Sequence, residues 1–237
     1  MRWQETYLDR FYGALVDGTT EFHTMCAAHI PRDATILEIG AGPSNDTSRF
    51  LSSLGRLSGL DVDPSMRSNL YLADAFVLET DVYPFADACF DACVSNYVLE
   101  HIANPRSHLS EVRRILRPGG VYLFRTPNRH HYVALVSRWT PHWIHTAIAN
   151  RLRRLPEEAP DPYPTYYRLN SRHAIRKAAA RSGLVVRELR MVEKEPSYGM
   201  ASRLMFVTFM LYERLVNSSA LFAVLRANVF GLLQRPQ

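Results

Sequence analysis

The sequence predicts an α/β fold, with a doubly wound, mostly parallel sheet of seven strands and an inserted α-helical cap. Three observations support this prediction. Short strand-like runs alternate with amphipathic segments, as they do when helices cover both faces of a parallel sheet. Hydrophobic residues make up 47% of the 237 residues and charged residues 22%, which excludes a disordered chain, a collagen-like repeat and a coiled coil. The alternation stops after Pro127, where five prolines fall between Pro141 and Pro164.

The strands are predicted from short apolar runs, rich in β-branched residues, that end at glycine, an acid or a turn. Alternation of such runs with helices predicts parallel pairing between them. The seven predicted strands are TILEIG (35–40), RLSGLDVD (56–63), AFVLETD (75–81), DACVSN (91–96), VYLFRT (121–126), LVVRELRMVE (184–193) and ANVFGLLQR (227–235).

The helices are predicted from apolar residues that recur at helical spacing. They cover residues 4–29 with a turn at Asp17-Gly18, then 48–54, 109–116, 171–183 and 201–216. The helix at 109–116 is stopped by Pro118-Gly119-Gly120, and the helix at 171–183 by Gly183, because proline and glycine end helices.

Charge is distributed unevenly along the chain. The formal net charge is +5 and the sequence pI is about 9.2. Residues 1–100 carry 6 basic and 15 acidic residues, a net charge of −9, whereas residues 101–237 carry 22 and 8, a net charge of +14. The two halves therefore face different partners, and the overall basic charge does not by itself predict a nucleic-acid ligand.

The cysteines and the terminus narrow the cellular setting. Cys26, Cys89 and Cys93 are too few for a disulfide framework, and no Cys/His cluster completes a metal site around them. The N-terminus lacks the apolar core of a signal peptide, and the most apolar run, residues 204–211, is too short to span a bilayer. We therefore expect a cytoplasmic protein that binds no metal ion.

The strongest motif is ILEIGAGPS at residues 36–44. A predicted strand runs into Gly40, Ala41 and Gly42, where glycine lets the backbone turn sharply and approach a ligand. A helix opens near Asn45, and its first N–H groups can bind a ligand. A dinucleotide-binding loop would require glycine at position 45. The alternative is a tight strand-to-helix turn without a ligand.

Acids follow the next two predicted strands. Asp61 lies 21 residues after Gly40, close to the spacing at which an acid binds the two hydroxyls of a ribose. Asp63 is its nearby competitor, and both acids could instead cap a helix before Pro64. An acid in ETDV, residues 79–82, can accept a hydrogen bond from an adenine amino group; the alternative is a solvated loop acid.

The fourth motif, FADACFDACVSNYVLEHI at 85–102, places Asn96 and Tyr97 at the carboxyl end of a strand. An open α/β sheet binds its ligand at that end. His101 follows on the next turn, and RILRPGGVYLFRTPN at 114–128 leads into the fifth strand.

In order and spacing, these motifs resemble the class I S-adenosylmethionine-dependent methyltransferases, of the broad group acting mainly on small molecules and lipids. The similarity covers residues 34–128, with a weaker echo at 183–193. It implies a Rossmann-like fold and S-adenosyl-L-methionine as the cofactor. The cofactor-binding residues that it implies are Glu38, Gly40, Ala41 and Gly42 at the methionine end, Asp61 at the ribose, Val62, Asp81 and Val82 at the adenine, and Asn96 and Tyr97 near the sulfonium. One departure is Ser44, which stands where the family has a third glycine.

The chemistry of that cofactor agrees with the charge of the first half of the chain. The cofactor is a sulfonium cation with an amino group, and it has no pyrophosphate that would need a phosphate-binding loop. Methyl transfer is an in-line displacement, in which alignment of the two partners contributes on the order of 7–11 kcal/mol. A base is needed only if the acceptor must lose a proton, as a hydroxyl must.

Candidate catalytic groups are His101, His130, His131 and Tyr167, each of which could instead be structural. Candidate acceptor contacts are Tyr12, Tyr166, Tyr167 and Arg168, and the alternative for the aromatic residues is packing of the cap. The predicted domains are an N-terminal helical lid (1–33), the cofactor-binding core (34–128), a cap (129–170) and the completion of the core (171–237).

We expect methyl transfer to a small-molecule acceptor, most favourably an oxygen in biosynthetic or secondary metabolism, by a monomer or homodimer. The alternatives are an RNA methyltransferase and a protein of this fold that uses the cofactor to steer a non-methylating reaction. We expect no nucleic-acid partner, because no base-methylation motif and no RNA-binding module are present. The helix at 201–216 is expected in a core or dimer interface, with a membrane surface as the less favoured alternative.

Overall fold

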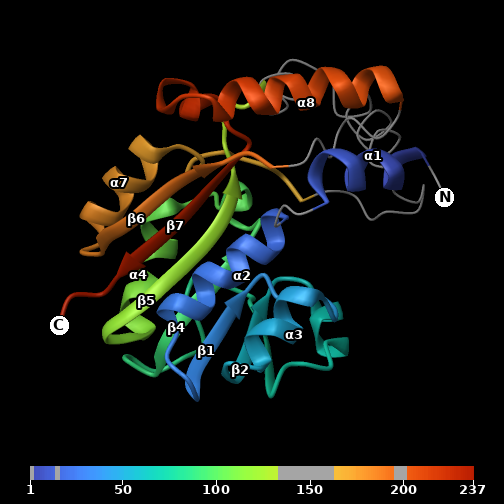
Figure 1. The fold of residues 1–237 in the computed structure, drawn as a ribbon. Helices are drawn as coiled ribbons and strands as arrows, with labels where there is room; N and C mark the ends of the chain where they lie inside the picture. The colour runs from blue at the N-terminus through green and yellow to red at the C-terminus, as the bar shows by residue number, and fades with distance from the viewer. Residues whose placement is uncertain (1–2, 14–16, 133–162, 195–201) are drawn as a thin grey trace. The chain divides into compact units, whose positions relative to one another are not determined.

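A computed structural model describes residues 3–13, 17–132, 163–194 and 202–237 of the chain (Figure 1). The chain divides into two compact units. The helical unit comprises residues 1–21, 128–163 and 191–228, and the sheet unit comprises residues 22–127, 164–190 and 229–237. The domain ranges 1–33, 34–128, 129–170 and 171–237 remain predictions.

The described residues form a seven-stranded sheet in the order β3-β2-β1-β4-β5-β7-β6. The strands are β1 (Ala34–Ile39), β2 (Gly55–Asp61), β3 (Asp74–Val77), β4 (Phe90–Asn96), β5 (Leu116–Pro127), β6 (Val185–Val192) and β7 (Asn228–Gln234). The five strands from β3 to β5 pair in parallel, so their carboxyl ends meet at one edge. The predicted doubly wound, mostly parallel sheet is confirmed.

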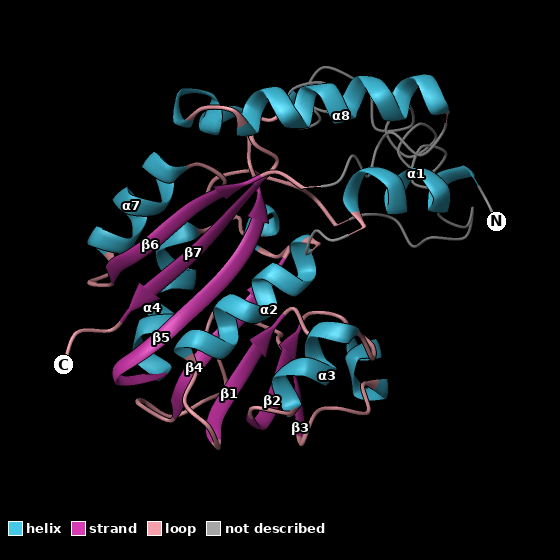
Figure 2. Ribbon diagram, in the orientation of Figure 1, coloured by secondary structure: helices cyan, strands magenta, loops and turns pink. Residues whose placement is uncertain are grey.

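Strand β7 runs against its parallel neighbours (Figure 2). The N–H of Gly119, early in β5, donates to the carbonyl of Arg235 at 3.0 Å. Farther along β5, Phe124 faces Gly231, where an added Cβ would lie 2.1 Å from the ring. Residue numbers thus rise along β5 and fall along β7, which makes this pair antiparallel.

Helices cover both faces of the sheet (Figure 2). They are α2 (Gly18–His29), α3 (Asp46–Ser52), α4 (Pro105–Ile115) and α7 (Arg172–Arg181). In this view α2 and α3 lie in front of the sheet and α4 lies behind it. The ring of His23 in α2 stacks on Phe50 of α3 at 4.4 Å between centroids. Between the layers, Ile36, Leu57 and Phe124 are fully buried and form part of the core.

The helical unit is built on aromatic packing. It contains α1 (Trp3–Tyr12), α8 (Arg203–Asn217) and the short 3-10 helix η4 (Ala220–Leu225). Phe206 of α8 lies among the rings of Trp3, Tyr7 and Tyr12, at 5.4 to 6.2 Å between centroids. The hydroxyl of Tyr12 donates to Oε2 of Glu213 at 3.0 Å. One face of α8 is therefore fixed against α1.

Two local features differ from the predictions. Strand β5 begins at Leu116, so the expected helix stop at Pro118-Gly119-Gly120 is part of a strand with an irregular register opposite Phe90. His101, expected on the turn after Asn96, ends a short 3-10 helix, η2 (Leu99–His101). No helix among the described residues is both long and apolar enough to cross a membrane.

Candidate active site at the carboxyl edge of the sheet

The turn after β1 requires glycine at two positions, for different reasons. Gly40 has φ +73° and Gly42 has φ +55°, both in the left-handed region that side chains disfavour. A Cβ on Gly40 would also lie 2.3 Å from Cγ2 of Val98. A Cβ on Gly42 would have no described neighbour within 4 Å. The backbone at Gly42 therefore borders open space at the ligand-binding edge.

Asn45 fixes the step from this turn into α3. Its side-chain oxygen accepts from the N–H groups of Thr47 and Ser48 at 2.9 and 3.0 Å. Its amide nitrogen donates back to the carbonyl of Ala41 at 2.8 Å. A glycine here, as in a dinucleotide-binding loop, would remove this cap.

Glu38 is a buried carboxyl group at the end of β1. It is 2% exposed, and the hydroxyl of Ser48 donates to its Oε2 at 2.6 Å. Burial, with repulsion from Asp61, raises the pKa of Glu38 to about 7 despite the hydrogen bond from Ser48. The amide of Asn69 also donates to Ser48, at 2.9 Å, which holds the hydroxyl in place. Glu38 can therefore exchange a proton near neutral pH.

Asp61, at the end of β2, is locked to the glycine turn. Its Oδ2 accepts from the N–H of Gly42 at 2.9 Å, and its Oδ1 accepts from the N–H of Asp63 at 2.9 Å. Asp63 itself caps the 3-10 helix η1 (Pro64–Ser68) by accepting from Ser65 at 2.8 Å. The geometry thus gives the capping role to Asp63 and presents Asp61 beside Gly42.

Asn96 ends β4, the next strand at this edge. Its Nδ2 donates to the Thr47 hydroxyl at 3.1 Å, which links β4 to α3. Its Oδ1 is buried and has no hydrogen-bond partner among the described residues. Because an unsatisfied buried acceptor is costly, this oxygen fits a ligand that supplies a donor.

The segment beyond β2 and β3 presents apolar side chains to solvent. Val62 and Val82 are exposed, although most large apolar side chains of this unit are buried. The carbonyl of Asp61 accepts from the N–H of Leu78 at 2.7 Å, which ties the chain after β3 to the end of β2. Asp81, next to Val82, is exposed as well. This edge suits a planar apolar ring with a polar rim.

Tyr97 stands beside a guanidinium group that the motifs did not predict. Its φ is +58°, and its backbone N–H donates to the carbonyl of Arg125 at 2.8 Å. The Arg125 side chain donates to the Tyr97 hydroxyl at 2.8 Å and lies 4.4 Å above the ring centroid. A charged residue near the end of the otherwise apolar run VYLFRT was the available signal for Arg125.

Glu100 joins the last residues of the predicted cap to this edge. Its carbonyl accepts from the N–H groups of Tyr166 and Tyr167 at 2.7 and 3.2 Å. Its carboxylate accepts from the Thr126 hydroxyl at 3.0 Å, and Asn170 donates to that hydroxyl at 2.6 Å. Asn170 also donates to the carbonyl of Pro127 at 2.9 Å.

His101 and Arg168 flank the same junction. Nδ1 of His101 lies 3.0 Å from the carbonyl oxygen of Pro164, which can only accept, so Nδ1 carries the proton. Arg168 donates to the carbonyl of Ala103, and its guanidinium lies 5.4 Å from the ring centroid of Tyr166. The structure thus brings His101, Tyr166, Tyr167 and Arg168 together, as candidates for one acceptor-facing group.

The other candidates belong to the helical unit. His131 is 4% exposed, its ring centroid lies 4.1 Å from that of Tyr132, and its Nε2 lies 3.6 Å from Oε2 of Glu193. Burial lowers the pKa of His131 to about 4. His130 is exposed, and Tyr12 is bonded to Glu213. The catalytic and acceptor roles of these residues remain predictions.

A buried chain of hydrogen bonds supports β4 from behind. The Tyr83 hydroxyl lies 2.7 Å from Nδ1 of His108, Nε2 of His108 lies 3.0 Å from the Tyr122 hydroxyl, and that hydroxyl lies 2.7 Å from Oγ of Ser95. Burial lowers the pKa of His108 to about 4, so its ring is neutral at pH 7 and donates at one nitrogen while accepting at the other. This chain ends next to Asn96.

Comparison with known proteins agrees with the geometry. A family described as a methyltransferase domain matches residues 37–124. An uncharacterised methyltransferase of Mycolicibacterium vanbaalenii is 33% identical over 130 residues, which cover 51% of each chain. The present chain spans about half the length of the curated relatives that it matches.

Solved structures show the same fold. Geranyl diphosphate C-methyltransferase from Streptomyces coelicolor, in complex with S-adenosyl-L-homocysteine, is similar over 91% of this chain and 76% of its own, with a TM-score of 0.57 and 16% identity. The [4+2]-cyclase SpnF is similar over 91% and 80%, with a TM-score of 0.55 and 13% identity.

The matched family and the glycine turn joined to Asp61 define the class of this protein. Residues 37–124 match a methyltransferase domain, and the fold is the Rossmann-like fold of the solved methyltransferases. The methyltransferase class predicted from the sequence agrees with this match. The roles of the individual site residues remain predictions.

Proposed function

We propose that this chain is an enzyme that transfers a methyl group from S-adenosyl-L-methionine to a small-molecule acceptor, most favourably to an oxygen in biosynthetic or secondary metabolism. The observation that carries the proposal is the hydrogen bond from Gly42 to Asp61, 2.9 Å long, which joins the glycine turn and the ribose-binding acid into one support. The residues proposed to hold the cofactor are Glu38, Gly40, Ala41, Gly42, Asp61, Val62, Asp81, Val82, Asn96 and Tyr97.

The residues at this edge fit that cofactor on physical grounds. Glu38 and Asp61 supply negative charge for a ligand that carries an ammonium and a sulfonium group. Oδ1 of Asn96 is a buried acceptor without a described partner, and a ligand N–H or O–H would satisfy it. Val62 and Val82 are exposed apolar groups that a bound adenine would cover.

The bound cofactor supplies a methyl group on a positively charged sulfur, which leaves as a neutral thioether. The chain has to hold the acceptor in line with that methyl group, since alignment is the main source of rate in such a displacement. We assign this positioning to Tyr97, Tyr166 and Arg168, which lie on the segments joined through Glu100.

A hydroxyl acceptor must also lose its proton. Among the candidate groups we favour His101, because its Nδ1–H is anchored on the Pro164 carbonyl and its Nε2 is then the basic nitrogen. His131 is a weaker candidate, since its lowered pKa, about 4, makes it a poor base at neutral pH. Tyr167 and His130 remain the other candidates.

Isothermal titration calorimetry tests the cofactor site directly. The wild-type chain should bind S-adenosyl-L-methionine and S-adenosyl-L-homocysteine, and Asp61→Ala should lose most of that affinity. Asp63→Ala is the matched control, because it removes an acid two residues away that caps η1. Failure of the wild type to bind either compound, or equal affinity of both variants, would contradict the proposal.

The acceptor class is tested with cofactor labelled in its methyl group. Transfer of label to hydroxylated small molecules supports the proposal, whereas transfer to RNA supports the nucleic-acid alternative. A rearranged product without the label would indicate that the bound cofactor steers a non-methylating reaction, and it would overturn methyl transfer as the function.

A further inference from the structure

The outward side of α8 carries an apolar stripe that no described residue covers. Leu204, Leu211 and Leu215 follow one another at spacings of seven and four residues, which places them on one face of a helix. They are 78%, 59% and 56% exposed. A helix packed on both sides would have buried these leucines.

The opposite side of α8 is the one that packs within its unit. Phe206 and Met210 are buried there against the rings of α1, and Glu213 accepts from Tyr12. At 100° per residue, Phe206 and Glu213 lie nearly half a turn away from Leu204 and Leu211, and Met210 lies about a third of a turn away. The exposed leucines therefore do not belong to the face that packs against α1. Helix α8 has one apolar face that packs within its unit and a second apolar face that is exposed.

The same exposed apolar character continues past the end of α8. In η4, Leu221 is 86% exposed, and Phe222, Val224 and Leu225 are exposed as well. The Tyr212 hydroxyl donates to the Leu225 carbonyl at 2.7 Å, which attaches η4 to the helix. An exposed apolar patch of this kind marks a surface that contacts another protein or a membrane.

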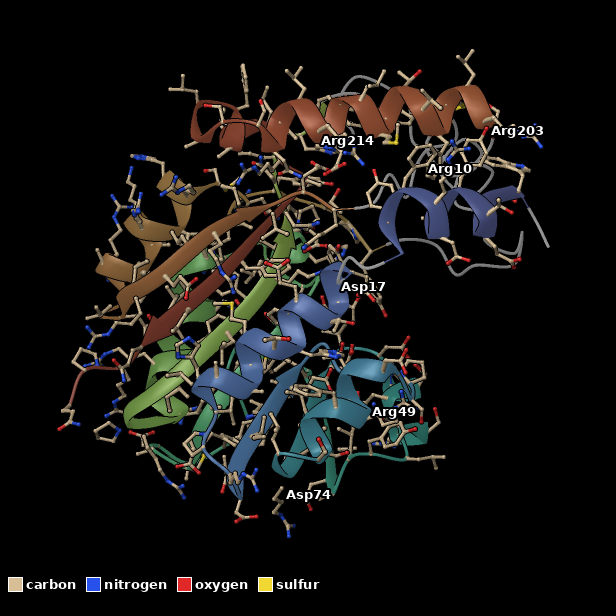
Figure 3. All side chains as sticks on the ribbon, in the orientation of Figure 1. Arg10, Asp17, Arg49, Asp74, Arg203 and Arg214 are labelled. Carbon is tan, nitrogen blue, oxygen red and sulfur yellow. The ribbon has the colours of Figure 1, made fainter. Side chains whose placement is uncertain are left out.

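Arginines accompany the stripe. Arg203 and Arg214 are eleven residues apart and so share one flank of α8, roughly a quarter turn from the leucines. Both are exposed, and neither forms an ion pair with another residue that the structure describes. Arg10 of α1 is a further exposed cation of this unit (Figure 3). Residues 101–237 as a whole carry a net charge of +14, so these arginines belong to a basic part of the chain.

We propose that α8 and η4 form an interfacial surface that binds the headgroup region of an anionic lipid bilayer. A helix with exposed leucines on one face and arginines on its flank lies in the membrane plane, with its apolar face among the acyl chains and its cations at the phosphates. Pairing of two copies through this face would bring Arg203 and Arg214 of each chain toward those of the other. The repulsion between these arginines disfavours such a dimer, whereas an anionic bilayer attracts them.

Vesicle co-sedimentation tests this surface with the whole chain. The wild type should bind phosphatidylcholine vesicles that contain phosphatidylglycerol, and binding should weaken as salt increases. Replacing both arginines, R203Q/R214Q, should lower the partition coefficient about 25-fold, since each cation near an anionic surface contributes a factor of about five. L211S/L215S should remove most of the binding. Leu70→Ser is the control, because Leu70 is 88% exposed but belongs to the sheet unit.

Every variant should keep the wild-type circular dichroism spectrum and its affinity for S-adenosyl-L-methionine, because the cofactor residues belong to the sheet unit. Failure of the wild type to bind anionic vesicles, or wild-type binding by L211S/L215S, would overturn the proposal. A dimer in light scattering that dissociates in L211S/L215S would overturn it too, since it would assign this face to a second copy of the chain.

Discussion

Glu38→Gln tests whether a buried, partly protonated carboxyl group lies at the cofactor's positive end. The pKa of Glu38 is about 7 in the folded chain, against 4.5 for the ordinary side chain. The difference corresponds to about 3 kcal/mol of folding free energy. Glutamine keeps the shape of the side chain and an oxygen that accepts from Ser48, but it cannot ionise.

The sign of the effect follows from the two pKa values. Below pH 4.5, Glu38 is protonated in the folded and the unfolded chain, so its ionisation does not change the free energy of unfolding. Between pH 4.5 and 7 the unfolded chain ionises more readily, and the free energy of unfolding falls. Urea denaturation should therefore show a loss of about 3 kcal/mol across this range in the wild type, relative to Glu38→Gln.

Binding of the cationic cofactor should lower the pKa of Glu38 and release its proton. At pH 7 about half of the Glu38 carboxyls are protonated, so up to about half a proton should be released per cofactor bound. Calorimetry in two buffers with different ionisation enthalpies measures this number. Equal proton release by the wild type and by Glu38→Gln would refute the reasoning, as would parallel stability curves from pH 4.5 to 7.

Two further predictions concern the supports of the site. Gly40→Ala should destabilise the fold, since its Cβ would lie 2.3 Å from Cγ2 of Val98, whereas Gly42→Ala meets no described atom and should cost only the strain of a positive φ, roughly 1 kcal/mol of stability. Both variants should lose cofactor affinity, because the Cβ at position 42 would enter the proposed cofactor site; urea denaturation and calorimetry measure the two effects, and equal losses of stability in both variants would contradict this contrast. Tyr122→Phe should lower the free energy of unfolding by about 2 kcal/mol, because it leaves Ser95 and His108 without their shared buried partner; a loss under about 0.5 kcal/mol would argue that the two side chains re-pair.

The fold was predictable because its signals are local. Each predicted strand is a short apolar or alternating run, and each overlaps an observed strand, with bounds that differ by at most five residues. Asp61 ends the apolar run and Asp63 follows it; in the structure Asp61 accepts from Gly42, and Asp63 caps η1. Both inferences needed only residues close in the sequence.

The remaining features depend on segments that are distant in sequence. Arg125 meets Tyr97 because β4 and β5 pair in one register, which no single run of residues specifies. The antiparallel direction of β7 depends on how the chain returns after η4. The burial of His131 follows from packing in the helical unit, whereas an isolated histidine after a strand looks like a functional group.

The contacts around Glu100 also bear on how the acceptor range of such an enzyme can change. Asn170 holds Thr126 and Pro127, and Glu100 holds Thr126 and the backbone of Tyr166, so the chain is clamped to the sheet on both sides of residues 128–163. The positions of Thr126 and Tyr166 are therefore set by bonds within the sheet unit, so the cofactor edge should keep its geometry when the sequence between these two residues changes.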